Sequence, residues 1–254
     1  MKWKINIRRE IAVVATLVGV SFLVAFSERR LSNNVCREVA IEIDNNQENH
    51  FLDEADVLKL VDNSGVAIKG SSINHINLKE IEGKLKYDKH IADAQLFSDL
   101  KGNLTVNVKL RRPVARIVQQ DAPDAYIAED GVVMPMSEKY TSRVLLLSGA
   151  FMKRLLETQN LSTTAEGKQI LEMIEFVNQN KFWKAQIAQM DVNSEGKIIL
   201  YPEISAQKVE FGRAENIEQK FDKLMLFYKR ILPQRGWTKY ARVNLEYEGQ
   251  IIAE

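Results

Sequence analysis

The sequence predicts an α+β protein made of a single transmembrane helix, a β-α-α-β-β unit and a strand-rich β domain with two helices. Three observations lead to this class. An uncharged apolar run occupies residues 11–26, near the N-terminus. After it, segments with apolar residues at every second position alternate with segments of helical period. The chain is 45% hydrophobic and 27% charged, a composition typical of compact folded domains.

The apolar run predicts a transmembrane helix over residues 11–27. The uncharged part gives roughly 24 Å of helix at about 1.5 Å per residue, and flanking arginines can lengthen the span by reaching the headgroups. Positive charge is denser on the N-terminal side, at Lys2, Lys4, Arg8 and Arg9. The positive-inside rule therefore predicts a cytoplasmic stub, residues 1–10, and an exported remainder.

Two other interpretations of the N-terminal segment stay open. Small residues at Ala25 and Ser27 could form a weak signal-peptide cleavage site, although the run is long for a signal core. Cys36, the only cysteine, follows the run as a lipidated cysteine would, but the residues before it are not small. An uncleaved anchor is the preferred interpretation. One cysteine also excludes an intrachain disulfide.

Charge beyond the anchor argues against a nucleic-acid partner. Residues 1–30 hold six of the 35 basic residues and two of the 34 acidic ones, so the rest of the chain is mildly acidic. Nucleic-acid binding needs a concentrated basic face that releases counterions from phosphates.

After a polar linker at 28–38, residues 39–112 have the pattern of the β-α-α-β-β unit. From Leu104 to Leu110 every second residue is apolar, as in a half-buried strand. Asp53 has the position of a helix N-cap. The expected elements are a strand at 39–43, helices at 53–61 and 77–87, and strands at 91–98 and 104–110.

Residues 113–254 are expected to form the β domain. Asp130-Gly131 predicts a tight hairpin within 126–134. Thr163 and Glu166 form a capping box for one helix, and Pro233 is expected to end the other. The expected strands are 144–147, 186–192, 197–201, 207–211 and 240–248, with the second helix at 217–232.

The terminal strand, 240–248, is the candidate partner-binding element. Every second residue, namely Ala241, Val243, Leu245 and Tyr247, is expected on the core face, and the polar residues between them on the wet face. A strand at a sheet edge can accept a partner strand through its backbone. The candidate contact residues are Tyr240, Arg242, Asn244, Glu246 and Tyr247. The alternative is that the strand only completes the core.

The sequence names no catalytic, cofactor-binding or metal-binding residue. His50, His75 and His90 are far apart and lie beside no further ligand at metal-binding spacing. There is no H-E-x-x-H, no G-x-S-x-G, no phosphate-binding loop and no dinucleotide fingerprint. A catalytic group assembled from distant residues would leave no motif, but the sequence offers no residue to assign to one. Because every motif is missing, we predict no enzymatic activity, no cofactor and no small-molecule substrate.

Four stretches together resemble the FtsQ/DivIB family of bacterial divisome proteins. They are residues 51–57, 106–116, 126–135 and 241–250, in this order along one anchored chain. The resemblance implies a POTRA domain followed by a β domain. It also implies a scaffold in the inner membrane at the division septum, with no catalytic residue. Such a scaffold binds small bitopic division proteins of the FtsB/FtsL type and links the cytoplasmic division ring to septal peptidoglycan synthases.

Two rival functions follow from the same patterns. Another POTRA-type periplasmic chaperone or secretion component would normally carry several such units or a long β-barrel. A membrane-anchored extracytoplasmic hydrolase would show a deep cleft with convergent titratable groups, whereas a scaffold would show a shallow surface bordered by strands.

Overall fold

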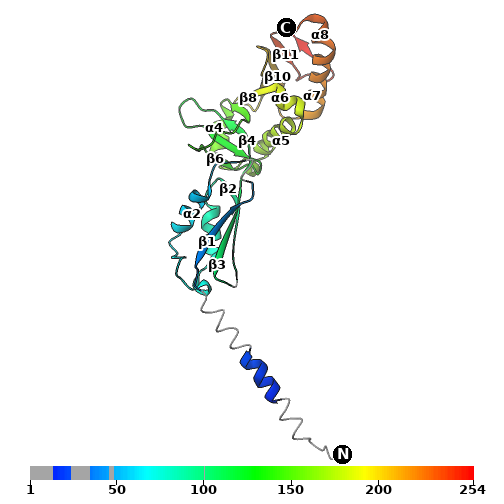
Figure 1. Cartoon of the computed structure of the whole chain (residues 1–254). Coiled ribbons are helices and arrows are strands. Elements are labelled where there is room, and N and C mark those ends of the chain that lie inside the picture. Colours follow the sequence, from blue (N-terminus) through cyan, green and yellow to red (C-terminus); the bar gives the residue numbers. More distant parts are fainter. Residues whose placement is uncertain (1–13, 24–34, 46–48, 100) are drawn as a thin grey trace, which may run out of the picture. The chain divides into compact units, whose positions relative to one another are not determined.

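The computed structural model describes residues 14–23, 35–45, 49–99 and 101–254 (Figure 1). The chain forms two compact units. Unit 1 comprises Met1–Asn46 and Leu52–Lys109, and unit 2 comprises Gln47–Phe51 and Leu110–Glu254. The sequence predicts a single boundary between the two domains, at residue 112. The structure differs, because residues 47–51 belong to unit 2 although the chain on both sides of them belongs to unit 1.

Residues 14–23 are helical, and their large apolar side chains are exposed. The predicted transmembrane helix at 11–27 extends beyond these described residues at both ends. The predicted stub at 1–10 and most of the linker at 28–38 lie outside the described residues. Within the described ranges, no helix combines the length and the apolar character that a membrane span requires.

Unit 1 has the predicted order β-α-α-β-β, with one short 3₁₀ turn, Ile73–His75, added between the helices. Its elements are β1 (Glu38–Ile43), α2 (Glu54–Asp62), α3 (Leu78–Lys86), β2 (Ile91–Ser98) and β3 (Asn103–Leu110). The sheet order is β1-β3-β2, and β1 runs parallel to β3. The central strand is therefore the last one in sequence.

Alternation in β3 and periodicity in the two helices explain the core of unit 1. The inward residues of all three elements are buried: Leu104, Val106 and Val108 of β3, Val57 and Val61 of α2, and Ile81 and Leu85 of α3. Asp53 caps α2 as predicted, since its Oδ1 accepts from the Asp56 N–H at 2.9 Å. In turn, the Asp53 N–H donates to Asp56 Oδ2 at 3.2 Å, which completes a capping box.

Unit 2 is built on a nine-stranded mixed sheet of order β12-β11-β10-β9-β8-β7-β4-β5-β6. The strands are β4 (Pro113–Ile117), β5 (Ala125–Ala128), β6 (Val133–Pro135), β7 (Leu145–Ser148), β8 (Ile187–Val192), β9 (Ile198–Pro202), β10 (Lys208–Gly212), β11 (Arg242–Asn244) and β12 (Ile252–Ala253). The pairs β4-β7, β7-β8 and β10-β11 are parallel, and the other pairs are antiparallel.

The expectation of two helices in this domain was wrong. The structure has α4 (Phe151–Glu157), α5 (Ala165–Gln179), α6 (Lys181–Gln186), α7 (Ile217–Leu226) and α8 (Leu232–Arg235), with a π-helical turn, η3 (Phe227–Ile231), between the last two. The sequence did not reveal α4 and α6 because seven and six residues are too few to show a helical period. Buried Phe151 and Trp183 hold these short helices against the core.

Two predicted helix boundaries also need correction. Thr164, not Thr163, caps α5, with its hydroxyl oxygen 3.1 Å from the Gly167 nitrogen. Pro233 does not end the last helix: it lies in the first turn of α8, where the fixed φ of proline is compatible with a helix. The helical segment ends at Gly236, whose φ is 102°.

Residues 49–51 belong to unit 2 because Phe51 is buried in a small apolar cluster with Tyr126, Ala128 and Met134. The Asn49 side-chain amide donates to the Arg111 carbonyl oxygen and anchors the same segment. The chain therefore passes between the two units three times.

Candidate partner-binding surface

The terminal strand is shorter than predicted. β11 contains only residues 242–244, although Val243 and Leu245 are fully buried as the alternation requires. The strand ends at Asn244 because its Oδ1 accepts from the Glu246 N–H at 2.8 Å, which turns the chain. The inward position is thus confirmed for Val243 and Leu245, whereas Ala241 and Tyr247, predicted on the same face, are exposed, and the predicted length of the strand was wrong.

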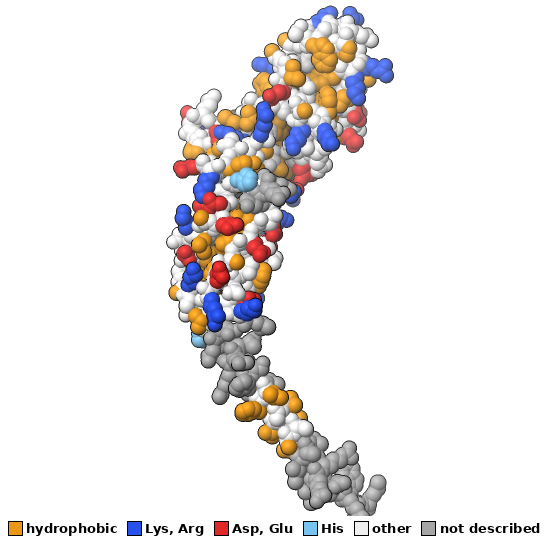
Figure 2. Space-filling view, viewed as in Figure 1, with side chains coloured by type: hydrophobic (Ala, Val, Ile, Leu, Met, Phe, Trp, Pro, Cys, Tyr) orange, Lys and Arg blue, Asp and Glu red, His pale blue; other side chains and the backbone are white. Residues whose placement is uncertain are grey.

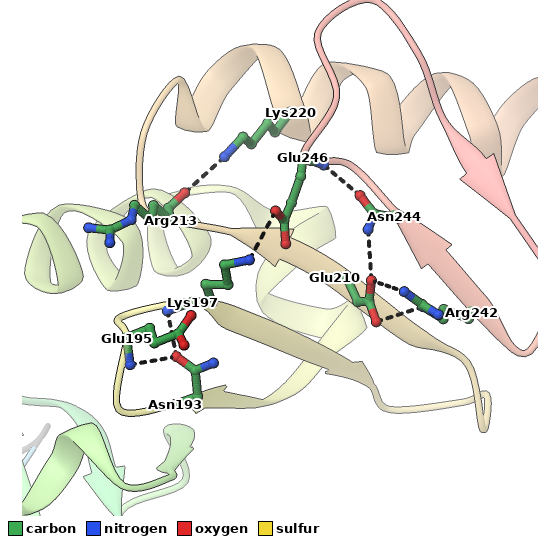
Figure 3. A network of polar contacts seen from close by, with 9 residues as sticks. All are labelled: Asn193, Glu195, Lys197, Glu210, Arg213, Lys220, Arg242, Asn244 and Glu246. Carbon is green, nitrogen blue, oxygen red and sulfur yellow. Dashed lines mark hydrogen bonds and ion pairs between the residues drawn. The ribbon is translucent and has the colours of Figure 1, made fainter.

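Glu210 of β10 organises the wet face of β11 (Figure 3). Its carboxylate accepts from Arg242 at 2.6 Å and 2.8 Å and from the Asn244 amide at 2.7 Å. The hydrogen bond to Glu210 is the main cause that raises the pKa of Arg242. Two of the predicted contact residues are therefore held by one acceptor.

Glu246 lies across the end of β10, and its carboxylate is 3.5 Å from Lys197 Nζ (Figure 3). Gly212 makes room for this side chain: a Cβ at that position would lie 2.7 Å from Glu246 Cγ. The φ of Gly212 is also positive, 75°, so a larger residue would be strained as well as crowded.

Lys223 of α7 fixes the loop between β11 and β12. Its ammonium donates to the carbonyl oxygens of Leu245, Tyr247 and Gln250 at 2.9, 2.7 and 3.3 Å. Burial lowers the pKa of Lys223, partly offset by the charge of Glu248. One cation thus positions the segment that delivers β12 to the sheet.

β12, not β11, forms this edge of the sheet, so the predicted edge position was wrong. The N–H and C=O of Arg242 both bond to Glu254 at 3.0 Å. Antiparallel bonding alternates, so the N–H and C=O of Ala253 point away from β11. Among the described residues, no strand pairs with this outer side. Two residues are too few to show an alternating pattern, which is why the sequence did not reveal β12.

The opposite edge of the sheet is covered. The Val133 N–H of β6 donates to the Gln159 carbonyl oxygen at 3.0 Å, and an isolated bridge joins Val132 to Asn160. β6 also ends in proline, which cannot donate to a neighbouring strand. The accessible edge of unit 2 is therefore that of β12.

The two predicted aromatic residues do not lie together. Tyr247 is 55% exposed in the loop held by Lys223. Tyr240 is half-buried at the start of β11, where its ring centroid is 5.7 Å from that of Phe227. Tyr240 also lines a pocket that the sequence did not reveal.

This pocket has a volume of about 550 Å³ and lies between the last helical segment and the loop before β10. Its lining carries no charged side chain: Gln186, Ile204, Ser205, Ala206, Gln207, Tyr228, Leu232, Trp237, Thr238, Tyr240 and Ala241. Ile204 and Trp237 are 86% and 58% exposed. Hydrophobic side chains are also visible near α8 on the surface of unit 2 (Figure 2). In the sequence, the only sign of this pocket was that two large apolar residues, Ile204 and Trp237, lie close to Pro202 and Gly236.

Within the described ranges, no three His, Cys, Asp or Glu side chains come close enough to hold a metal ion. The polar contacts of this region join β-strand side chains and turns to one another (Figure 3).

These features define a two-domain α+β protein whose second domain exposes a sheet edge. Residues 34–109 match the family model of POTRA-like domains, and residues 112–254 match the model described as FtsQ/DivIB, C-terminal related. The chain belongs to the FtsQ/DivIB family, as the resemblance in its sequence predicted.

Family membership makes the chain a divisome-associated protein of the POTRA type. Domains of these families are generally non-catalytic scaffolds that act through protein–protein interactions. A comparison with curated proteins gave no significant match.

Proposed function

We propose that this chain is a non-enzymatic, membrane-anchored scaffold of the divisome. It binds small bitopic division proteins of the FtsB/FtsL type and links the cytoplasmic division ring to septal peptidoglycan synthesis, with septal synthases as further partners. The observation that carries this proposal is the uncovered edge of β12 in a domain of a scaffold family.

The proposed location is the inner membrane at the division septum, with the N-terminus in the cytoplasm and the bulk in the periplasm. The charge asymmetry around residues 11–27 supports this orientation. Residues 14–23 fit an anchor, because they form a helix whose large apolar side chains are exposed. A reporter fused after Glu254 that works only outside the cytoplasm should be active. Activity of a cytoplasm-only reporter at that site would contradict the proposed topology.

Partner binding occurs by strand addition to β12. The outward N–H and C=O of Ala253 pair with the partner backbone. A strand of two residues offers few such bonds, each contributing about 1 kcal/mol net, whereas micromolar affinity needs about 8 kcal/mol. Side-chain anchors must supply the rest. Tyr247 is exposed and lies in the loop that leads to β12.

The lining of the pocket beside Tyr240 favours a scaffold over a hydrolase that would act there. The lining of the large pocket contains two tyrosines but no Asp, Glu, His, Lys, Arg or Cys. General acid–base or nucleophilic hydrolysis would need such groups to converge there.

Ala253→Pro tests strand addition directly. The Ala253 N–H points away from β11, so proline removes a donor for the partner without breaking a native ladder bond. We expect the full chain carrying Ala253→Pro to lose affinity for its FtsB-type partner at least about tenfold, because the added strand loses a bond and meets the proline ring. Ala253→Val keeps the N–H and is the matched control. Unchanged affinity of the proline variant would overturn the proposal.

A further inference from the structure

The pocket beside Tyr240 is lined by a residue that carries an unpaired polar group. The Tyr228 hydroxyl is buried and has no hydrogen-bond partner among the described residues, and the whole residue is only 4% exposed. Buried tyrosine hydroxyls normally find a partner, since leaving one unpaired costs its full desolvation. Tyr228 therefore presents apolar surface, and not its hydroxyl, to the pocket.

The backbone around Tyr228 is also unusual. Tyr228 lies in the π-helical turn η3, and π turns within α-helices occur frequently at functional sites. The neighbouring Phe227 is buried as well, so the turn directs two consecutive aromatic residues into the protein.

The position of the pocket relates it to the edge of β12. Ala241 lines the pocket and donates its N–H to the Glu254 carbonyl oxygen at 2.7 Å. A strand added outside β12 would lie two strand spacings, about 10 Å, from β11. About three extended residues cover that distance. A peptide that extends the sheet can thus reach the pocket as it leaves the strand.

The chemistry of the lining restricts what can enter. The lining residues offer apolar surface, two tyrosines, two glutamines and small polar groups, but no countercharge. A charged side chain would lose hydration without gaining a partner. Exposed Trp237 and Ile204 offer further apolar contact to a group that enters.

We propose that this pocket receives an uncharged aromatic or leucine-sized side chain from the peptide that extends the sheet at β12. The inference rests on the proposed function in one respect, because strand addition identifies the occupant as a peptide. The pocket is a second anchor, at the opposite end of β11 from Tyr247.

The pocket can be tested without any partner, using N-acetyl-phenylalaninamide as the probe. The chain has three tryptophans, Trp3, Trp183 and Trp237, so the full chain labelled with 5-fluorotryptophan gives three ¹⁹F signals that single Trp→Phe variants assign. We expect the probe to shift the Trp237 signal saturably in the millimolar range and to leave Trp3 unchanged. N-acetyl-lysinamide should cause no saturable shift. An unmoved Trp237 signal, or equal shifts with both probes, would overturn the inference.

The Ala253→Pro chain distinguishes this inference from the proposed function. If this variant loses affinity for the protein partner but the probe still shifts its Trp237 signal, both proposals are supported. Strand addition and probe binding in the pocket are then independent. If the chain binds the probe and Ala253→Pro keeps full partner affinity, strand addition fails while the apolar pocket stands. If Ala253→Pro weakens the partner and no probe shifts Trp237, the pocket fails and strand addition stands.

Discussion

The ring of Phe51 packs edge-on against the ring of Tyr126, with centroids 5.2 Å apart and an interplanar angle of 61°. Phe51 thus contributes to the core of unit 2, although the chain on both sides of 47–51 belongs to unit 1. Phe51→Ala should destabilise unit 2 by about 3–5 kcal/mol, as large-to-small changes at buried aromatic residues do. Thermal unfolding of the full chain should show the transition of unit 2 shifted downwards. Phe97→Ala, at an exposed phenylalanine of unit 1, is the control and should leave that transition in place.

Val106→Asp should unfold unit 1. Val106 is fully buried in the central strand β3, and an unpaired charge there costs several kcal/mol. Lys109→Asp, on the same strand but exposed, is the control. Backbone amide exchange across 39–110 is the measurement. Protection retained in the Val106→Asp chain would show that the inward face of β3 has been misassigned.

Lys223→Met should loosen the end of the sheet while α7 stays folded. The variant leaves the carbonyl oxygens of Leu245, Tyr247 and Gln250 without their shared donor. Hydrogen exchange should accelerate at the Arg242 and Glu254 amides, which join β11 to β12. Lys229→Met changes an exposed lysine nearby and should have no such effect. Equal exchange in both variants would mean that Lys223 does not position β12.

The outward residues of β11 differ in their expected effect on folding. Arg242→Ala should change Tm little, because the side chain is exposed and surface ion pairs contribute little to stability. Asn244→Ala should cost about 1–2 kcal/mol, since Asn244 bonds to Glu210 and caps the turn at Glu246. If residue 242 contributes to docking, Arg242→Ala should weaken partner binding although Tm is kept.

Tyr228 should make the stability of unit 2 depend on pH in the alkaline range. Burial raises its pKa from about 10 to about 12. The unfolded chain therefore releases the phenolic proton at lower pH than the folded chain does. The stability present below pH 10 is lost as the pH rises towards 12, by about 2–3 kcal/mol. Denaturant unfolding of the unchanged chain and of Tyr228→Phe, compared at pH 9 and pH 11.5, should show this loss only where the hydroxyl is present.

How much of the structure could be predicted depended on the length of each element. Unit 1 was predictable because eight alternating residues in β3 and nine-residue amphipathic helices have clear periods. The inward Val243 and Leu245 were predictable for the same reason. β12 could not be predicted, because two residues show no alternation and only long-range pairing with β11, Val243 with Ala253 and Asn244 with Ile252, defines the strand. The pocket was hidden because Ile204, Tyr228 and Trp237 lie in three separate segments.

The π turn at Phe227–Ile231 has a consequence for comparing this chain with its relatives. Such a turn adds one residue to an α-helix without adding a corresponding length of α-helix, and each residue of an α-helix accounts for about 100° of rotation. A relative with a regular helix at this point would align with a single-residue gap near Lys229. Ungapped alignment would pair Leu232 with the wrong face of the relative's helix. Residue-by-residue transfer of surface or core roles beyond position 231 therefore requires that the gap be placed first.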